Sequence, residues 1–305
     1  MSSELTLKDV EGLGYYDFMG YMGVPFFNIG GVASMDKLAE LCQITERTKI
    51  LEVGCGTGAN ACYLAKRYRC SVVGIDIAEH MVRYALKRAE DLDLTNRVSF
   101  RVGNAYSLEF PDDDFDAVLT VFVSQFLNPA RAFPEFYRVL KAGGCLGVNE
   151  MYKADNLPPE AMDRVNYGER VFRELTDLPF TLRSPESWVS AFESAGFSDI
   201  LMEEHSNSSE KPYALSKVDD FGGWGKLVGT LWGVLVLALR SRKMRERFGK
   251  IGEAKSVLLR DKVASSYMGY ILCVGRKSMI DPKCLYPHIM HVCAHFRDKA
   301  TYAEN

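Results

Sequence analysis

Three glycines in five residues mark the first position where this sequence could hold a ligand. The segment Glu52-Val-Gly-Cys-Gly-Thr-Gly58 lies between an apolar run and a helical pattern. Gly54, Gly56 and Gly58 allow a tight turn and a close approach of the backbone to a ligand. Glycine-rich turns also serve dinucleotides, so the loop alone identifies nothing. An anionic Glu52 beside a helix N-terminus would repel a pyrophosphate, and it suits a cationic amino-acid group instead.

Two further polar positions follow predicted strands. Asp76, with Ile77 after it, ends the apolar run SVVGIDI. A carboxylate at this point can accept hydrogen bonds from both ribose hydroxyls of an adenosine. Asn104 and Ala105 end the next strand, where an amide can meet the adenine edge and a small residue leaves room for the ring. Together these residues predict an adenosine-containing cofactor.

Alternating strands and helices must position these residues. Short apolar runs predict strands at residues 49–55, 71–77, 98–104, 115–123, 145–152, 198–205 and 267–277. Helical spacing predicts helices at 34–44, 59–69, 78–94, 129–144 and 184–197. Such alternation is typical of an α/β protein with a doubly wound, mostly parallel sheet of seven strands.

The chain divides into five parts on this interpretation. They are an N-terminal lid (1–34), a cofactor-binding core (35–205), a helical insertion that faces substrate or membrane (206–266), the last core strand (267–277) and a C-terminal tail (278–305).

Five motifs in order resemble class I S-adenosylmethionine-dependent methyltransferases of the ubiquinone/menaquinone and sterol/tocopherol kind. They are LEVGCGTG (51–58), GID (74–76), GNA (103–105), FPDDDFDAV (110–118) and RVLKAGG (138–144), and the resemblance covers roughly residues 45–152. It implies a Rossmann-like fold with S-adenosyl-L-methionine as cofactor. It also implies that Glu52 and Gly54 hold the methionine end and that Asp76 holds the ribose.

The resemblance also assigns the adenine end of the cofactor. It implies that Asn104 and Ala105 meet the adenine, with Val121 beneath the cofactor. The family usually has Asp where Asn104 stands. The amide still offers a carbonyl acceptor for the adenine amine, so this departure changes little.

Methyl transfer from a sulfonium is an in-line displacement, so the main task is alignment and exclusion of water. The N-terminal segment is predicted to form the lid, with aromatic residues Tyr15, Tyr16, Tyr21, Phe26 and Phe27. Aromatic faces favour a sulfonium charge, and equally they can simply pack the segment onto the sheet. Tyr16 and Tyr21 are the lid residues that we predict to be catalytic.

A general base is needed only if the acceptor must first lose a proton. The candidates are His80, Glu150, Tyr152 and His205. Glu150 is preferred because it closes a strand on the catalytic side, although a solvent-facing strand end is an equal alternative.

Composition bears on nucleic-acid binding, metal binding and the place of the protein in the cell. The net charge of −3 gives no reason to expect nucleic acid. The eight cysteines include no C-x-x-C pair, and His288, His291 and His295 have no acidic partner, so no metal is expected. The N-terminus lacks an apolar signal region, which predicts a cytoplasmic protein.

Residues 227–239 contain no charge, and six basic residues follow at 240–250. This composition is typical of a segment at a membrane surface, too short to span it. A buried core helix with a basic extension is the alternative, and it is slightly favoured. Two enzyme classes therefore stay open: one for a lipophilic acceptor, such as a quinone-like, phenazine or prenylated ring, and one for a soluble amine, phenol or thiol. A scaffold that binds the cofactor and dimerises through residues 206–266 is the third alternative.

Overall fold

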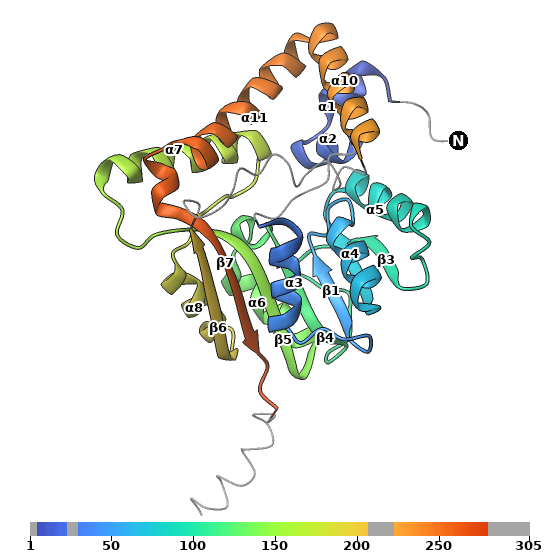
Figure 1. Ribbon diagram of the computed structural model, residues 1–305, viewed down its shortest axis with the longest axis vertical. Coiled ribbons are helices and arrows are strands. Elements are labelled where there is room, and N and C mark those ends of the chain that lie inside the picture. The colour runs from blue at the N-terminus through green and yellow to red at the C-terminus, as the bar shows by residue number, and fades with distance from the viewer. Residues whose placement is uncertain (1–4, 23–29, 207–222, 280–305) are drawn as a thin grey trace, which may run out of the picture.

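The computed structural model describes residues 5–22, 30–206 and 223–279 (Figure 1). Seven strands form one sheet: β1 (Lys49–Val53), β2 (Ser71–Asp76), β3 (Val98–Val102), β4 (Phe115–Val121), β5 (Leu140–Lys153), β6 (Ser198–Ser206) and β7 (Met268–Arg276). Their order is β3-β2-β1-β4-β5-β7-β6. Strands β1 to β5 pair in parallel, and β7 runs antiparallel to both β5 and β6. The predicted seven-stranded, mostly parallel sheet is confirmed.

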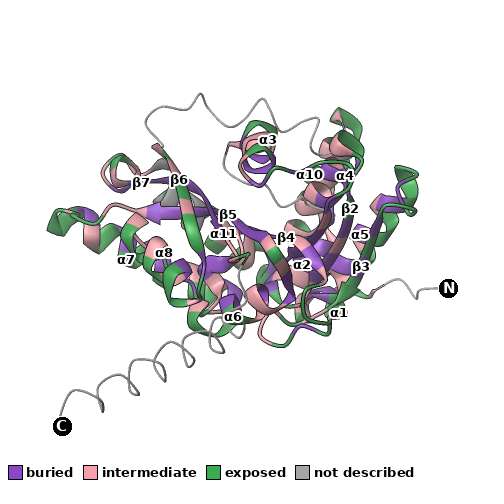
Figure 2. Cartoon of the chain, turned by 90° about the horizontal axis from the view of Figure 1, so that it is seen from below, coloured by how far each residue is buried: buried purple, intermediate pink, exposed green. Residues whose placement is uncertain are grey.

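Helices cover both faces of this sheet, as seen edge-on in Figure 2. One face packs against α3 (Gly31–Leu41), α4 (Ala59–Tyr68) and α5 (Glu79–Asp91). The other packs against α6 (Pro129–Val139) and α8 (Pro185–Ser194). Parallel strands buried on both faces need continuous apolar sequence, and β1 shows it, since neighbouring Ile50 and Leu51 belong to opposite core clusters.

Strand order reverses between β1 and β4, whose carboxyl ends lie side by side. Open α/β sheets bind ligands at such a switch point. The glycine loop follows β1, and the short 3-10 helix η1 (Ser124–Phe126) follows β4. The fold therefore brings the loops after both strands to one crevice.

The N-terminal segment and the insertion pack on each other above this edge of the sheet (Figure 1). The elements are α1 (Leu7–Gly12), α2 (Tyr15–Tyr21), α10 (Trp224–Arg240) and α11 (Arg242–Arg260). Their side chains meet the start of α5 in one apolar group, the lid cluster, whose buried members are Val10, Tyr15, Phe18, Met19, Ala78, Met81 and Met244. None of the described helices is both long and apolar enough to cross a membrane.

Several element boundaries differ from the sequence prediction. Helix α3 begins at Gly31, because Gly30 adopts a left-handed conformation (φ 84°) as its N-cap, and not at Ser34. Helix α6 ends at Val139, and β5 starts at once and includes Gly143 and Gly144, which were expected to end the helix.

Two further helical segments belong to the described residues, and the sequence prediction omitted the first of them. Helix α7 (Pro159–Thr176) buries Ala161, Val165 and Val171 on one face and lies against α11. The 3-10 helix η3 (Ala264–Tyr267) leads into β7.

Candidate cofactor and acceptor pocket

A pocket with about 1100 Å³ of empty space, partly open to solvent, lies at the switch point between β1 and β4. The loops after β1, β2, β3 and β4 line it, together with Tyr16 from α2 and Leu178 and Pro179 from the segment after α7. The lid and the sheet thus contribute to one cavity.

The glycine loop forms one wall of the pocket through Gly54 and Gly56. Both have positive φ (73° and 52°). A Cβ on Gly54 would lie 2.3 Å from a Val123 methyl, so the loop and the β4 loop approach too closely for any other residue. Gly58 does not line the pocket. Its absent side chain instead leaves room for Phe100, which a Cβ would meet at 2.7 Å.

Asp76 lines the pocket and also organises the loops around it. One carboxylate oxygen accepts from the Gly56 backbone N–H at 2.9 Å, and the other accepts from Ala78 N–H at 2.9 Å. Burial raises the pKa of this carboxyl above its ordinary value. Each carboxylate oxygen has a second lone-pair direction, so the group can still accept from two ribose hydroxyls.

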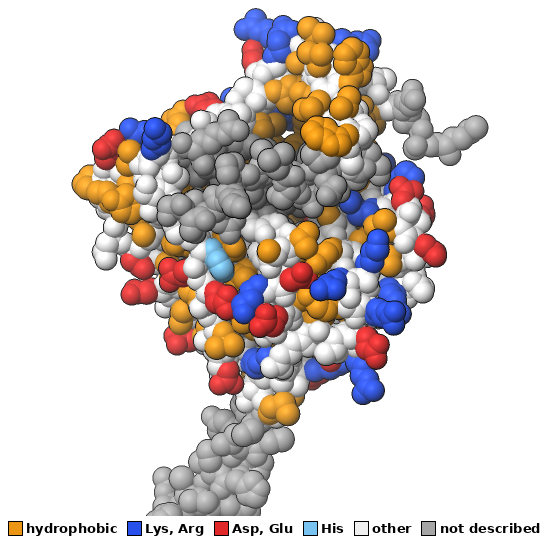
Figure 3. All heavy atoms as spheres, viewed as in Figure 1, with side chains coloured by type: hydrophobic (Ala, Val, Ile, Leu, Met, Phe, Trp, Pro, Cys, Tyr) orange, Lys and Arg blue, Asp and Glu red, His pale blue; other side chains and the backbone are white. Residues whose placement is uncertain are grey.

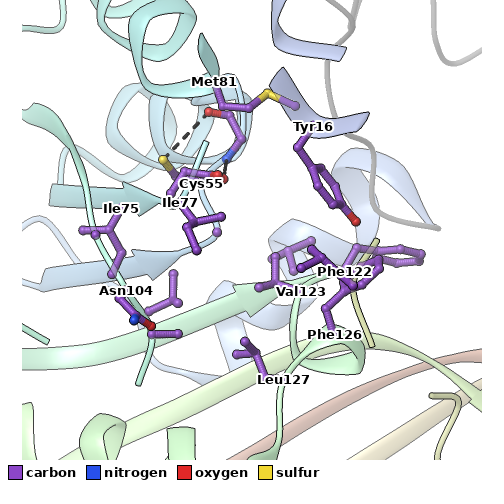
Figure 4. Close-up of a pocket in the computed structure, with 18 of the residues that line it drawn as sticks. Tyr16, Cys55, Ile75, Ile77, Met81, Asn104, Phe122, Val123, Phe126 and Leu127 are labelled. Carbon is purple, nitrogen blue, oxygen red and sulfur yellow. Dashed lines mark hydrogen bonds between the residues drawn. The ribbon is translucent and has the colours of Figure 1, made fainter. Parts of the chain in front are cut away.

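Ile77, Asn104 and Ala105, which the sequence predicts as cofactor-binding residues, also line the pocket. Ile77 is 68% exposed, which leaves its side chain available to cover a flat ring. The side-chain oxygen Oδ1 of Asn104 accepts from Tyr106 N–H at 2.9 Å, which fixes the side-chain amide just after β3. Figure 4 shows Ile77 and Asn104 on the same side of the cavity, across from Tyr16.

Glu52 does not line the pocket; it is buried directly beneath the glycine loop and is 1% exposed. Burial raises its pKa to about 8, although hydrogen bonds from the Asn60 side chain and Ala61 N–H favour the anion. Its Oε2 has no hydrogen-bond partner among the described residues. A buried carboxylate with one unsatisfied oxygen, next to Asn60 in the pocket wall, fits a cationic group such as the ammonium of the cofactor's methionine end.

Another part of the pocket is apolar, and Val121 at the end of β4 also lines the pocket. Phe122, Val123, Phe126 and Leu127 line the apolar part from the β4 loop (Figure 4). The loop leaves the strand at Phe122, which has φ 60°. A left-handed aromatic residue stores strain that the surrounding structure must hold in place. The sequence prediction missed this, because it continued the strand through Phe122 and Val123.

Glu150 holds that loop from behind. Its Oε1 accepts from Val123 N–H at 3.0 Å and from Ser124 N–H at 2.7 Å, with Thr120 Oγ1 at 3.4 Å. Glu150 is fully buried and does not line the pocket, and burial raises its pKa to about 7. The sequence predicted that Glu150 closes its strand and reaches the pocket, but β5 continues to Lys153 and the Glu150 side chain supports the β4 loop without lining the cavity.

Of the two tyrosines predicted to be catalytic, only Tyr16 lines the pocket. Its ring packs edge-to-face on Phe126 with centroids 5.7 Å apart, and Figure 4 shows it extending from α2 toward the β4 loop. Burial raises the pKa of its hydroxyl well above 10, so Tyr16 stays neutral and can donate a hydrogen bond. Tyr21 packs at the margin of the lid cluster, and its carbonyl accepts from Tyr84 Oη at 2.6 Å. It is therefore part of the lid and not of the pocket wall.

The other candidate bases also lie away from the described lining. His80 follows the ribose-side loop on α5, where its backbone N–H donates to Asp17. Tyr152 is packed in the core beneath α8, and His205 stacks on Tyr270 with ring centroids 4.5 Å apart. Phe26, Phe27 and the three C-terminal histidines lie outside the described residues, and the described part of the chain contains no cluster of metal ligands.

Comparison with known proteins gives the following similarities. Residues 51–148 match a family model described as a methyltransferase domain. The chain is 30% identical over 205 residues to the sterol 24-C-methyltransferase of Aspergillus fumigatus, covering 66% of this chain and 52% of that protein. It is 26% identical over 186 residues to phosphoethanolamine N-methyltransferase 1 of Arabidopsis thaliana, covering 61% and 36%. The chain thus spans between about a third and half of the length of these curated relatives.

Solved structures share the fold. The [4+2]-cyclase SpnF superposes with a TM-score of 0.59 and 26% identity, covering 81% of this chain and 80% of that one. The phosphoethanolamine N-methyltransferase 2 of Haemonchus contortus, in complex with S-adenosyl-L-methionine, superposes with a TM-score of 0.59 and 20% identity, covering 91% and 58%. A cyclase among these neighbours means that the fold alone does not fix the reaction.

Proposed function

The chain carries a class I S-adenosylmethionine-dependent methyltransferase domain, as its motifs predicted, and we propose that it transfers the methyl group to a small lipophilic acceptor. One observation carries this proposal. The glycine loop, Asp76 and Asn104 form one half of a pocket, and the other half is apolar and aromatic. Cofactor and acceptor can therefore meet inside a single cavity, from which a bound acceptor would displace water.

We assign the cofactor to the polar half. Asp76 would accept from the ribose hydroxyls, Asn104 and Ala105 would meet the adenine with Ile77 over the ring, and Val121 would lie below. Gly54 and Gly56 allow the backbone to approach, and Glu52 would ionise behind the loop when the ammonium group of the cofactor binds. When bound, the cofactor supplies an electrophilic methyl on a sulfonium; the protein supplies alignment and exclusion of solvent.

The acceptor half favours an uncharged, greasy molecule. Its described lining includes Phe122, Phe126, Leu127, Leu178 and Pro179, with no Lys, Arg, His or Glu. A phosphorylated acceptor would need cations there, since a buried anion without a partner is costly. Tyr16 is the polar group that faces this half. We propose that its ring stacks near the reacting centre and that its hydroxyl donates a hydrogen bond to an oxygen of the acceptor.

The proposal assigns positioning roles to the remaining predicted residues. Glu150 would hold the β4 loop in its strained form and would not act as base, and Tyr21 would stiffen the lid. Transfer to a soluble amine, phenol or thiol remains the alternative. Phosphoethanolamine, the acceptor in the name of one relative, is a polar molecule and falls in this alternative class. Self-association through residues 206–266 stays a prediction.

Calorimetry with S-adenosylhomocysteine tests the cofactor half. We expect Asp76→Asn to weaken binding by a factor of at least ~10, because one charge-assisted hydrogen bond contributes roughly 1.5–3 kcal/mol. The control is Asp93→Asn, an exposed carboxylate after α5 at φ 56°, a conformation that Asn tolerates. Equal affinities for native protein and Asp76→Asn would contradict the assignment.

Transfer of tritiated methyl tests the acceptor half. Native protein should label prenylated or quinol-type rings in preference to phosphoethanolamine or free amines. Turnover confined to the polar acceptors would favour the alternative, and cofactor binding without turnover on any acceptor would favour the scaffold.

A further inference from the structure

Helix α10 presents an apolar side to solvent. Six of its side chains are between 47% and 71% exposed: Trp224, Val228, Leu231, Trp232, Leu235 and Leu239. At about 100° per residue these positions fall within an arc of about 100°, so they form one continuous stripe. We call it the apolar face of α10. Figure 3 shows hydrophobic side chains gathered over this helix.

A basic turn adjoins the apolar face. Arg240 ends α10, and Arg242, Lys243 and Arg245 open α11, all exposed. Residues 240–250 contain six basic side chains and one acid, Glu246, which pairs with Arg242. Arg247 is not part of the turn, because it donates to the Leu13 carbonyl and lies over the Phe18 ring, 5.0 Å from its centroid. Figure 3 shows Lys and Arg side chains at this tip of the molecule.

Packing fixes the orientation of this hairpin. Ser241 caps α11 by accepting from Met244 N–H at 3.1 Å and also donates to Glu11 of α1. Leu237 contacts the lid cluster, and Met244 is fully buried in it. The inner side of α10 therefore rests on the lid, and the apolar face points away from the protein. A buried core helix, which the sequence left open, is excluded.

We propose that the apolar face of α10 and the basic turn dock this protein on the surface of an anionic lipid bilayer. Exposed apolar stripes of this length are unusual on soluble monomers, and interfacial helices combine Trp and Leu on one side with Lys and Arg beside it. An anionic bilayer complements both features. A second copy of this hairpin would cover the apolar face but would bring a second set of cations and, within residues 224–250, only Glu246 as an acid.

The docked orientation places the pocket near the bilayer. Helix α2 carries Tyr16 into the pocket on one side and contributes Tyr15, Phe18 and Met19 to the lid cluster on the other. The same cluster receives Leu237 and Met244 from the docking hairpin. A lipophilic acceptor that leaves the bilayer would therefore meet the lid of the pocket first. This part of the inference rests on the proposed function; the docking itself does not.

Cosedimentation with vesicles tests the docking. Native protein should bind vesicles of phosphatidylglycerol and phosphatidylcholine at least tenfold more tightly than vesicles of phosphatidylcholine alone. The preference should fall in 1 M salt, where the Debye length is ~3 Å compared with ~10 Å at 0.1 M. Equal or negligible binding to both vesicle types would overturn the proposal.

Two sets of variants separate the apolar and the basic contributions. Trp232→Ser with Leu235→Ser removes part of the apolar face, and Arg240→Gln, Arg242→Gln and Lys243→Gln remove three cations. Each cation contributes up to about fivefold to partitioning on an anionic surface, so the basic variant should bind at least tenfold more weakly. The control for the apolar variant is Leu86→Ser with Leu201→Ser. The control for the basic variant is Lys66→Gln with Arg83→Gln and Lys87→Gln. All five residues are exposed and lie elsewhere on the fold. Controls that lose binding as strongly as the variants would refute the assignment.

Tryptophan fluorescence gives a second measurement on native protein. The chain has three tryptophans, and Trp188 is fully buried while Trp224 and Trp232 are 68% and 65% exposed. Anionic vesicles should therefore shift the emission to the blue, and Trp224→Phe with Trp232→Phe should abolish that shift. A shift that persists in this double variant would place the lipid contact elsewhere.

S-adenosylhomocysteine binding, measured on the same samples, keeps the two proposals apart. Native protein that binds this ligand but no vesicle contradicts the docking alone. Protein that binds vesicles but not the ligand contradicts the proposed function alone. If sedimentation equilibrium shows that Trp232→Ser with Leu235→Ser breaks a dimer and native protein ignores vesicles, the apolar face is an interface between copies and the membrane inference is wrong.

Discussion

Replacing Glu52 by Gln should stabilise the protein without cofactor and weaken cofactor binding. Glu52 is buried beneath the glycine loop, and burial raises its pKa from 4.5 to about 8. The folded state therefore prefers the protonated acid. The stability that this preference contributes is fully present below pH 4.5 and is lost as the pH rises toward 8. Above pH 4.5 the unfolded protein releases this proton, whereas the folded protein must either keep it or ionise a buried group.

The size of the effect follows from the shift. One pKa unit corresponds to 1.36 kcal/mol, so at pH 7 the native protein loses about 3 kcal/mol relative to a group that is neutral at every pH. Gln has nearly the same shape and no charge. We therefore expect Glu52→Gln to exceed native protein in free energy of unfolding by up to about 3 kcal/mol at pH 7, and by close to zero at pH 4.5.

Urea unfolding from pH 4.5 to 8.5, without cofactor, measures this difference. Glu90→Gln, at an exposed position on α5, is the matched control and should track native protein at every pH. Calorimetry with S-adenosylhomocysteine should show the opposite order, with Glu52→Gln the weaker binder at pH 8. A variant that is less stable than native protein at pH 7, by a margin that does not change with pH, would refute the reasoning.

Three further predictions concern the pocket walls and the loop. Tyr16→Phe should keep cofactor affinity and lower turnover, measured as kcat, whereas Tyr16→Ala should also raise KM, since the ring packs on Phe126. Glu150→Ala should raise KM for both substrates, because it frees the β4 loop. Glu150→Gln should restore much of the loss, because an amide oxygen can accept from the same backbone N–H groups. Equal activity in both variants would exclude the positioning role. Gly58→Ala should reduce the free energy of unfolding by about 1–3 kcal/mol in urea titrations, because a Cβ would lie 2.7 Å from Phe100 at φ 72°.

The sequence predicted the sheet, and the place of Asp76 and Asn104 at its carboxyl edge, well, because local signals determine them. Buried parallel strands require continuous apolar runs, and the turns after them require glycine or short polar residues at fixed positions. Asp76 and Asn104 each follow such a run directly, so their place at the carboxyl edge of the sheet follows from topology alone. These residues line the pocket in the structure.

The acceptor half was predicted less well, because it depends on contacts between distant segments. Leu178 and Pro179 reach the pocket from beyond α7, a helix that the sequence prediction omitted although Ala161 and Val165 show helical spacing. The direction of Glu150 also escaped prediction. A carboxylate near the carboxyl end of a strand can point into a cavity or into the protein, and here the strained turn at Phe122 supplies backbone N–H groups that draw it inward.

Helix α10 shows a deeper limit of hydrophobic patterning. An uncharged stretch of thirteen residues has the same composition whether protein or lipid covers it, so periodicity cannot separate the two. The distinction depends on which neighbours exist, and α1, α2 and α11 together cover only the side that carries Leu237. The Trp and Leu side chains on the other side have no such neighbour among the described residues and stay in solvent. Exposing a continuous apolar surface to water costs free energy, and such surfaces on soluble proteins usually mark an interaction site. The cations of the basic turn follow α10 directly in sequence. The exposed apolar face and the adjacent positive charge together favour a bilayer as the partner, although neither feature alone would do so.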